Sequence, residues 1–138
     1  MRPLRRRDLR SSQALLECVI DRAARFHGTH PVAAKLTISG ETPPELKRID
    51  READRERART FLGLLEEHFV LPRVPHRERV VYFVAEIIDL SFMLSMNEAG
   101  RLTPAWIAHA KAAAGAVLAH YFGEDLKRRP ATRAAPGA

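Results

Sequence analysis

Residues 80–96 have the sequence VVYFVAEIIDLSFMLSM, which is apolar on nearly every side of a helix. A helix of this kind must be covered on several sides, so the stretch predicts the centre of a helical core. It carries Glu86 and Asp89 and is shorter than the ~20 residues that a membrane-spanning helix needs. We therefore predict a core helix over 75–99 that ends at Gly100, and no membrane span.

The rest of the chain also has helical periodicity, and no segment alternates as a strand does. Ser11 or Ser12, Thr42 and Thr103 stand where side chains cap helix starts, and proline follows the last two at an early helical position. Gly28 is expected to end the first helix. The sequence predicts an all-α fold of five helices, over about 12–27, 31–38, 43–70, 75–99 and 104–122.

Length and composition indicate one domain. The chain has 138 residues, of which 46% are apolar and 29% are charged, an ordinary balance for a globular protein. Cys18 is the only cysteine, which excludes an internal disulfide and favours a cytoplasmic location. We expect a basic N-terminal arm over 1–10, one helical domain over 11–123 and a flexible tail over 124–138.

The net charge of +6 comes from the ends of the chain. Residues 1–10 carry five arginines and one aspartate, and residues 123–138 carry four basic and two acidic residues, while residues 11–122 hold 14 of each sign. A DNA-binding domain would be expected to concentrate positive charge on one folded face. The count disfavours DNA binding by the body and leaves weak nucleic-acid binding through the Arg-rich ends as an alternative.

The predicted third helix has two unlike halves. Over residues 45–59, 11 of 15 residues are charged, and oppositely charged pairs three residues apart support one another modestly. The second half carries Phe61, Leu62, Leu65 and Phe69 at helical spacing. We expect the first half to project into solvent and the second half to enter the core.

The last two helices predict a homodimer, because they retain little polar surface. Small residues on the final helix would let another backbone approach closely, and two helices from each subunit would form a four-helix interface. In the alternative, both helices are simply the core of a monomer. The predicted interface residues are Phe92, Trp106, Ala108, Ala112, Gly115 and Ala119.

Two carboxylates interrupt the apolar fourth helix. Glu86 and Asp89 share one helical stripe with Tyr82 and Met93. In one interpretation this stripe is solvated or borders an interface, since carboxylates are almost never buried unpaired. In the other, Glu86 or Asp89 lines an internal cavity and orients a ligand.

No residue pattern supports catalysis, a metal site or a cofactor. The chain has no glycine-rich phosphate loop, no nucleophile elbow and no zinc-protease motif. His27 and His30 are three apart but span Gly28, and we interpret them as a helix-end feature instead of a metal-ligand pair. An enzymatic function therefore has no support in the sequence.

Three stretches nevertheless suggest a family: FHGTHP at 26–31, PPEL at 43–46 and IDREADR at 49–55, followed by two apolar helices. Over residues 11–123 this order resembles the C-terminal domain of TetR-like transcriptional regulators. The resemblance implies an all-α domain that dimerises through its last two long helices and binds a small apolar or aromatic effector between helices. The candidate pocket residues are Phe26, Phe61, Leu65, Tyr82, Glu86 and Met93.

The family's N-terminal helix-turn-helix has no counterpart in residues 1–10. DNA binding is therefore expected only if sequence upstream of Met1 supplies that element. The leading hypothesis is a regulator's effector-binding and dimerisation domain. The alternative of another class is a helical homodimeric interaction module with no small-molecule site.

Overall fold

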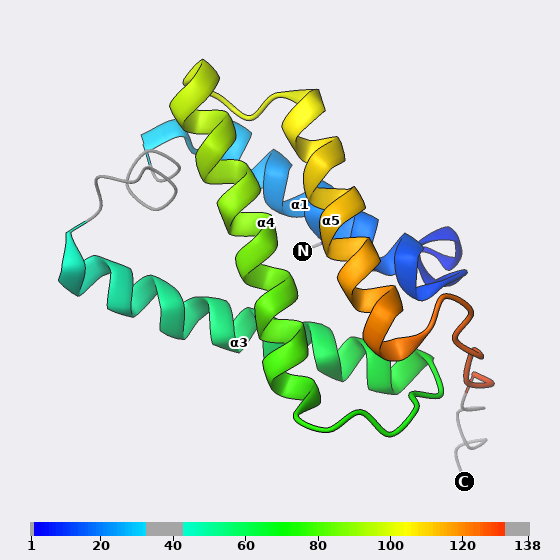
Figure 1. Cartoon of the computed structure of the whole chain (residues 1–138). Coiled ribbons are helices and arrows are strands. Elements are labelled where there is room, and N and C mark those ends of the chain that lie inside the picture. Colours follow the sequence, from blue (N-terminus) through cyan, green and yellow to red (C-terminus); the bar gives the residue numbers. More distant parts are fainter. Residues whose placement is uncertain (1, 33–42, 132–138) are drawn as a thin grey trace, which may run out of the picture.

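The computed structural model describes residues 2–32 and 43–131, and within them it is all-helical with no β-strand (Figure 1). The all-α prediction is thus confirmed. Pro31 and Val32 are helical, while the rest of the helix predicted over 31–38 lies outside the described residues. The elements are the 3-10 helix η1 (Arg6–Leu9) and the α-helices α1 (Ser12–Thr29), α3 (Pro44–His68), α4 (Arg77–Ala99) and α5 (Pro104–Phe122).

Helix α1 begins at its predicted cap, where the Ser11 hydroxyl accepts a hydrogen bond from the Ala14 amide at 3.0 Å. The prediction that the helix ends before Gly28 is wrong by two residues. The helix continues to Thr29, whose hydroxyl donates to the carbonyls of Arg25 and Phe26 and so satisfies the last turn.

Helix α3 has the two unlike halves that its sequence predicts. Leu46 and Ile49 in the first half are exposed, and the buried positions begin at Asp54. The predicted Thr42 cap lies outside the described residues, and the helix starts directly after Pro43. In Figure 1 the first half extends away from the other helices, as expected of a charged segment.

The end of α3 differs from the prediction. The helix stops at His68, because the next residues pair with the C-terminal segment. The Val70 amide donates to the Lys127 carbonyl at 2.7 Å, and the Arg129 amide donates to the His68 carbonyl at 2.8 Å. Residues 127–129 of the predicted tail thus form backbone hydrogen bonds with the residues at the end of α3.

Helix α4 packs against both α3 and α5. It starts at Arg77 instead of about residue 75, since His76 adopts the left-handed conformation with a φ of 53°. It ends at Gly100 as predicted. By length and composition α4 is long enough and apolar enough to cross a membrane, but the core helix of a soluble protein meets the same criteria.

A buried serine fixes the turn between α4 and α5. The Ser95 hydroxyl donates to the Arg101 carbonyl at 2.8 Å and accepts from the Thr103 amide at 2.9 Å. Thr103 in turn caps α5 as predicted, accepting from the Trp106 amide. This arrangement sets the antiparallel packing of the two helices seen in Figure 1.

The N-terminal arm folds back onto α1. Leu4 and Leu9 pack against the core, and η1 lies against α1. The Arg22 guanidinium donates to the Pro3 carbonyl at 3.3 Å, and the Arg5 amide donates to the Asp8 carboxylate at 2.8 Å. Two apolar side chains and these hydrogen bonds account for the order of the arm.

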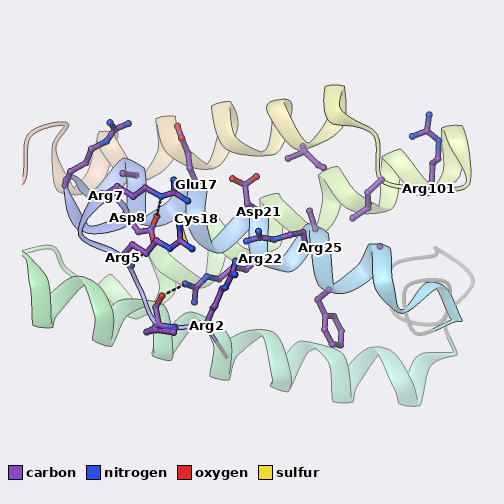
Figure 2. A pocket seen from close by; sticks show the side chains of 18 residues that line it. Arg2, Arg5, Arg7, Asp8, Glu17, Cys18, Asp21, Arg22, Arg25 and Arg101 are labelled. Atoms are coloured by element: carbon purple, nitrogen blue, oxygen red, sulfur yellow. Dashed lines mark hydrogen bonds and ion pairs between the residues drawn. The ribbon is translucent and has the colours of Figure 1, made fainter.

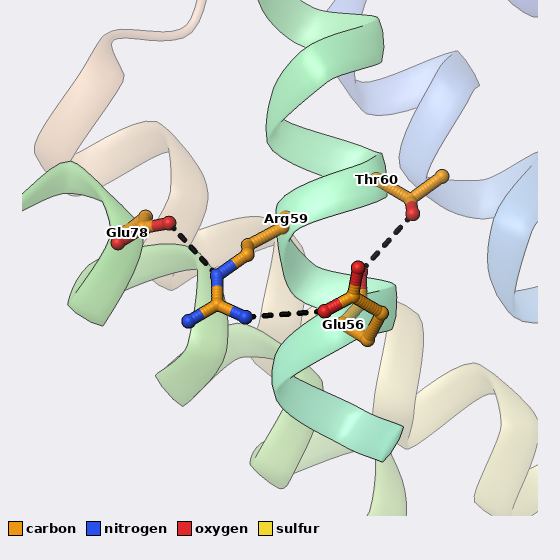
Figure 3. A network of polar contacts seen from close by, with 4 residues as sticks. All are labelled: Glu56, Arg59, Thr60 and Glu78. Carbon is orange, nitrogen blue, oxygen red and sulfur yellow. Dashed lines mark hydrogen bonds and ion pairs between the residues drawn. The ribbon is translucent and has the colours of Figure 1, made fainter. Parts of the chain in front are cut away.

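Exposed ion pairs also join α3 to α4. Arg59 of α3 donates to Glu56 one turn earlier and to Glu78 of α4, both at 3.1 Å (Figure 3). The neighbouring Thr60 hydroxyl donates to the Glu56 carbonyl at 3.0 Å. The Glu56–Arg59 pair was expected from its spacing along α3, whereas the contact with Glu78 depends on how the two helices pack.

Candidate functional site

Three carboxyl groups meet between α3 and α4. Asp54 of α3 is only 7% exposed, and it faces Glu86 and Asp89 of α4. Carboxyl oxygens of the three residues all lie within 4.8 Å of one another. Positions 86 and 89 are three apart on a helix and so share a face, and that face is turned toward α3.

The environment changes the ionisation of this acid cluster, defined as Asp54, Glu86 and Asp89. Burial raises the pKa of Asp89 to about 8, and a hydrogen bond with Asp54 and the charge of that residue act in the same direction. Asp89 therefore holds a proton at neutral pH and can donate it in a hydrogen bond to Asp54. Arg57 forms an ion pair with Asp54 and supplies the positive charge of the site.

The acid cluster contains a polar atom without a hydrogen-bond partner in the described residues. The Oε1 atom of Glu86 is buried and has no hydrogen-bond partner within the described part of the chain. The ring of Tyr82 lies beneath the Arg55 guanidinium, 5.2 Å from its carbon, and burial together with Glu86 raises the pKa of the phenol. A buried acceptor without a partner is costly unless something else binds it.

His27 adds a second buried polar atom near the same place. Its Nδ1 has no hydrogen-bond partner among the described residues, and its ring lies edge-on to Phe92 with centroids 5.9 Å apart. Burial lowers the pKa of His27, and the positive charge of Arg57 adds to this effect. His27 is therefore neutral at physiological pH and can accept or donate one hydrogen bond.

The predicted pocket residues divide into three groups. Tyr82 and Glu86 lie at the acid cluster, and Met93 is half-buried further along the same helix. Phe61 and Leu65 are buried in the core. Phe26 is 55% exposed and lines a groove on the outer side of α1, apart from the other five predicted residues.

Sequence reasoning left Asp54 and His27 out of the site. Asp54 stands in the most charged stretch of the chain, and its burial depends on where α4 crosses α3. His27 was interpreted as a helix-end feature. The helical spacing could have predicted the burial of Asp54. It lies four residues before Ala58 and seven before Phe61, on the face of α3 that is buried.

Three carboxylates are the ligands that hard divalent cations accept. Here, however, Asp89 is protonated at neutral pH and Arg57 already neutralises Asp54. A protonated carboxyl is a poor metal ligand, and metal binding would have to displace its proton. A divalent cation at the acid cluster would therefore have to displace the proton of Asp89 and compete with Arg57 for Asp54.

The residues predicted for a dimer interface are also divided. Ala108 and Ala112 are exposed on α5, and Trp106 and Ala119 are half-buried. Phe92, at 1% exposure, is core within the protomer, and Gly115 faces Gln13 of α1, whose amide donates to its carbonyl at 3.0 Å. Both were wrongly assigned, because periodicity alone does not tell which side of an apolar helix meets its own chain.

Large apolar side chains remain exposed on the outer face of α4 and α5. Phe83 and Leu90 are each 52% exposed, and Leu94 and Tyr121 are also exposed. Phe83, Leu90 and Leu94 are spaced seven and four apart, so they follow one line along α4. We call these four residues the outer face below.

A known protein family matches this chain. The family described as the tetracyclin repressor-like C-terminal domain matches residues 10–122, which is most of the chain. No curated protein and no solved structure matches significantly. The matched range spans α1 to α5 and leaves out the arm and the C-terminal segment. The chain therefore belongs to the tetracyclin repressor-like C-terminal domain family.

Proposed function

We propose that this domain is the effector-sensing and dimerisation part of a cytoplasmic, non-enzymatic transcriptional regulator. Its effector is a small apolar or aromatic molecule that also carries an amine or another hydrogen-bond donor. The effector binds where α1, α3 and α4 come together, beside the acid cluster. DNA reading would require a helix-turn-helix outside residues 1–138.

The observation that carries this proposal is the acid cluster itself. Three carboxyl groups with oxygens within 4.8 Å of one another, one of them with its pKa raised to about 8, are unfavourable for packing alone. Such perturbed groups are more common at functional sites. The unpartnered Oε1 of Glu86 is an acceptor for the donor group of an effector. The apolar neighbours Phe92 and Met93 provide the surroundings that an aromatic skeleton prefers.

The same helix connects the effector site to the dimer. Asp89 is on the side of α4 toward α3, and the exposed Phe83 and Leu90 lie three residues before and four residues after Glu86, so Glu86 stands between the acid cluster and the outer face. An effector that prefers one spacing of α3 and α4 shifts the population of α4 positions. Because α4 also supplies the outer face, this shift changes the geometry between two subunits.

The effector proposal is tested by calorimetry with aromatic amines, each paired with the alcohol of the same carbon skeleton. We expect an amine to bind more tightly than its alcohol, and E86Q to remove most of this difference. E67Q, an exposed glutamate on α3, is the matched control and should leave it unchanged. A folded wild-type domain that binds none of the amines would contradict the proposal.

Dimerisation is tested separately, by light scattering of the wild type and of L90E. A charge buried at the centre of an apolar interface is strongly unfavourable, so L90E should be a monomer at concentrations where the wild type is a dimer. L46E, on the exposed half of α3, is the control for adding a charge at an exposed leucine. A monomeric wild type at high micromolar concentration would refute the dimer.

A further inference from the structure

A hollow lies on the side of α1 that faces the N-terminal arm. It is formed by the N-terminal arm, the outer side of α1 and the connection between α4 and α5, and has a volume of about 1090 Å³ (Figure 2). Ligand sites for small organic molecules occupy roughly 300–1,000 Å³. The groove is therefore large enough for a metabolite of moderate size.

The lining of this groove is strongly basic. Seven arginines line it against three carboxylates, and they come from separate parts of the chain. Figure 2 shows Arg5 of the arm near Arg22 of α1, with Arg25 further along α1 and Arg101 in the α4–α5 connection. The neutral charge count of the body hid this arrangement, because folding gathers arginines of the arm and body on one face.

Two of the three carboxylates already have partners. Asp8 accepts the Arg5 amide and lies 3.7 Å from the Arg7 guanidinium. Asp21 forms an ion pair at 2.7 Å with Lys111 of α5. The hydrogen bond from the Arg5 backbone is the main cause that lowers the pKa of Asp8, so the arm stays anchored by an ionised carboxylate at neutral pH.

Arg25 of α1 and Arg101 of the α4–α5 connection are lining arginines from two different elements, and Figure 2 shows them at separate places along the groove. Both are exposed, and neither guanidinium forms an ion pair with a described residue. A guanidinium binds phosphate oxygens with two parallel hydrogen bonds, and a concave basic surface concentrates anions. Apolar side chains, including Leu102 and Ile107, also line the groove and suit the uncharged part of such a ligand.

We propose that this groove binds a phosphorylated small molecule with at least two negative charges, at a site distinct from the effector site. The ligand chemistry is that of a pyrophosphate group, free or joined to an organic part. Duplex DNA fits less well, because its backbone needs positive charge along a face that it can follow, and these arginines surround a hollow. Occupation would hold the arm against α1 and the α4–α5 connection.

Isothermal titration of the full chain with pyrophosphate and with ADP tests the site, and adenosine serves as the uncharged comparison. We expect both phosphates to bind, adenosine not to bind, and affinity to fall as salt is raised. R25Q/R101Q should weaken both phosphates by about tenfold or more, since each lost charge-assisted contact accounts for at least that factor. Neither side chain forms a hydrogen bond or an ion pair with a described residue, so the variant should remain folded.

R51Q/R73Q is the matched control, because it removes two exposed arginines outside the groove. It should leave the affinity for both phosphates within about twofold, well below the tenfold step that 1.4 kcal/mol represents. An equal loss in the two double variants would indicate general attraction to a basic protein and overturn the site. If neither phosphate binds at low salt, the proposed site is also overturned. It is overturned as well if duplex DNA binds through Arg25 and Arg101 while pyrophosphate does not bind.

Discussion

The acid cluster and the arginine groove are opposite in both charge and burial. The cluster brings three carboxyl groups together between α3 and α4, and the groove brings seven arginines to an open hollow beside α1. Burial changes how the acids ionise, because a carboxylate deprived of water holds its proton more tightly. Arginines remain charged in either setting. The two regions should therefore differ in how they respond to pH, salt and substitution.

The largest expected effect is the pH dependence that Asp89 gives to stability. The folded chain holds this proton up to a pKa of about 8, whereas the ordinary value is 3.8. Between these values the folded state binds more protons than the unfolded state, so the free energy of unfolding falls as pH rises. The slope reaches at most about 1.4 kcal/mol per pH unit.

D89N should flatten this slope, because an asparagine amide imitates the protonated carboxyl and can still donate to Asp54. Urea denaturation from pH 5 to pH 8 measures the effect, with D125N in the exposed C-terminal segment as control. The raised pKa of Asp50 and the lowered pKa of His27 are present in both the wild type and D89N. The difference between the pH profiles of the two proteins therefore reports on Asp89 alone. Parallel pH profiles for D89N and the wild type would refute the protonated state.

A smaller effect is expected when the partner of Asp54 is removed. R57Q leaves the buried Asp54 carboxylate without its ion pair and should lower the free energy of unfolding by about 1–3 kcal/mol, because hydrogen bonds to charged groups contribute that much. Because the Arg57 side chain is itself well exposed, we expect a loss of unfolding free energy near the lower limit of this range. R51Q on the same helix should have little effect in the same denaturation experiment, and equal losses in the two variants would contradict the role of the pair.

The groove should give the smallest effect on stability. R25Q/R101Q is expected to leave the thermal midpoint nearly unchanged, since substitutions of exposed side chains without partners usually change stability little. Differential scanning calorimetry without ligand measures it. A clear loss of stability would mean that these arginines support the fold, and the contrast between the two regions would then be wrong.

Local signals in the sequence were enough for the framework of the fold. Ser11 and Thr103 cap their helices, and Gly100 ends α4, because capping depends on a few neighbouring residues. The stripe of Tyr82, Glu86 and Asp89 does share one face, since helical periodicity fixes which residues lie together.

Contacts between distant segments could not be predicted in this way. Phe92 and Gly115 were assigned to a dimer interface, yet both meet their own chain. In the sequence, Asp54 is one of many charged residues in the α3 segment. Its burial depends on the packing of α4 against α3, which the sequence does not show. The arginine groove was likewise hidden, because it depends on the arm folding back and on Pro3 receiving a hydrogen bond from Arg22.

The most direct test of the acid cluster is an NMR titration of the side-chain carboxyl carbons from pH 3 to pH 9. The account predicts that Asp89 titrates with a pKa of about 8 and that D54N lowers this value, because the hydrogen bond and charge of Asp54 raise it. A pKa for Asp89 close to 3.8 in the folded protein would contradict the claim that α3 and α4 enclose a protonated, ligand-ready carboxyl.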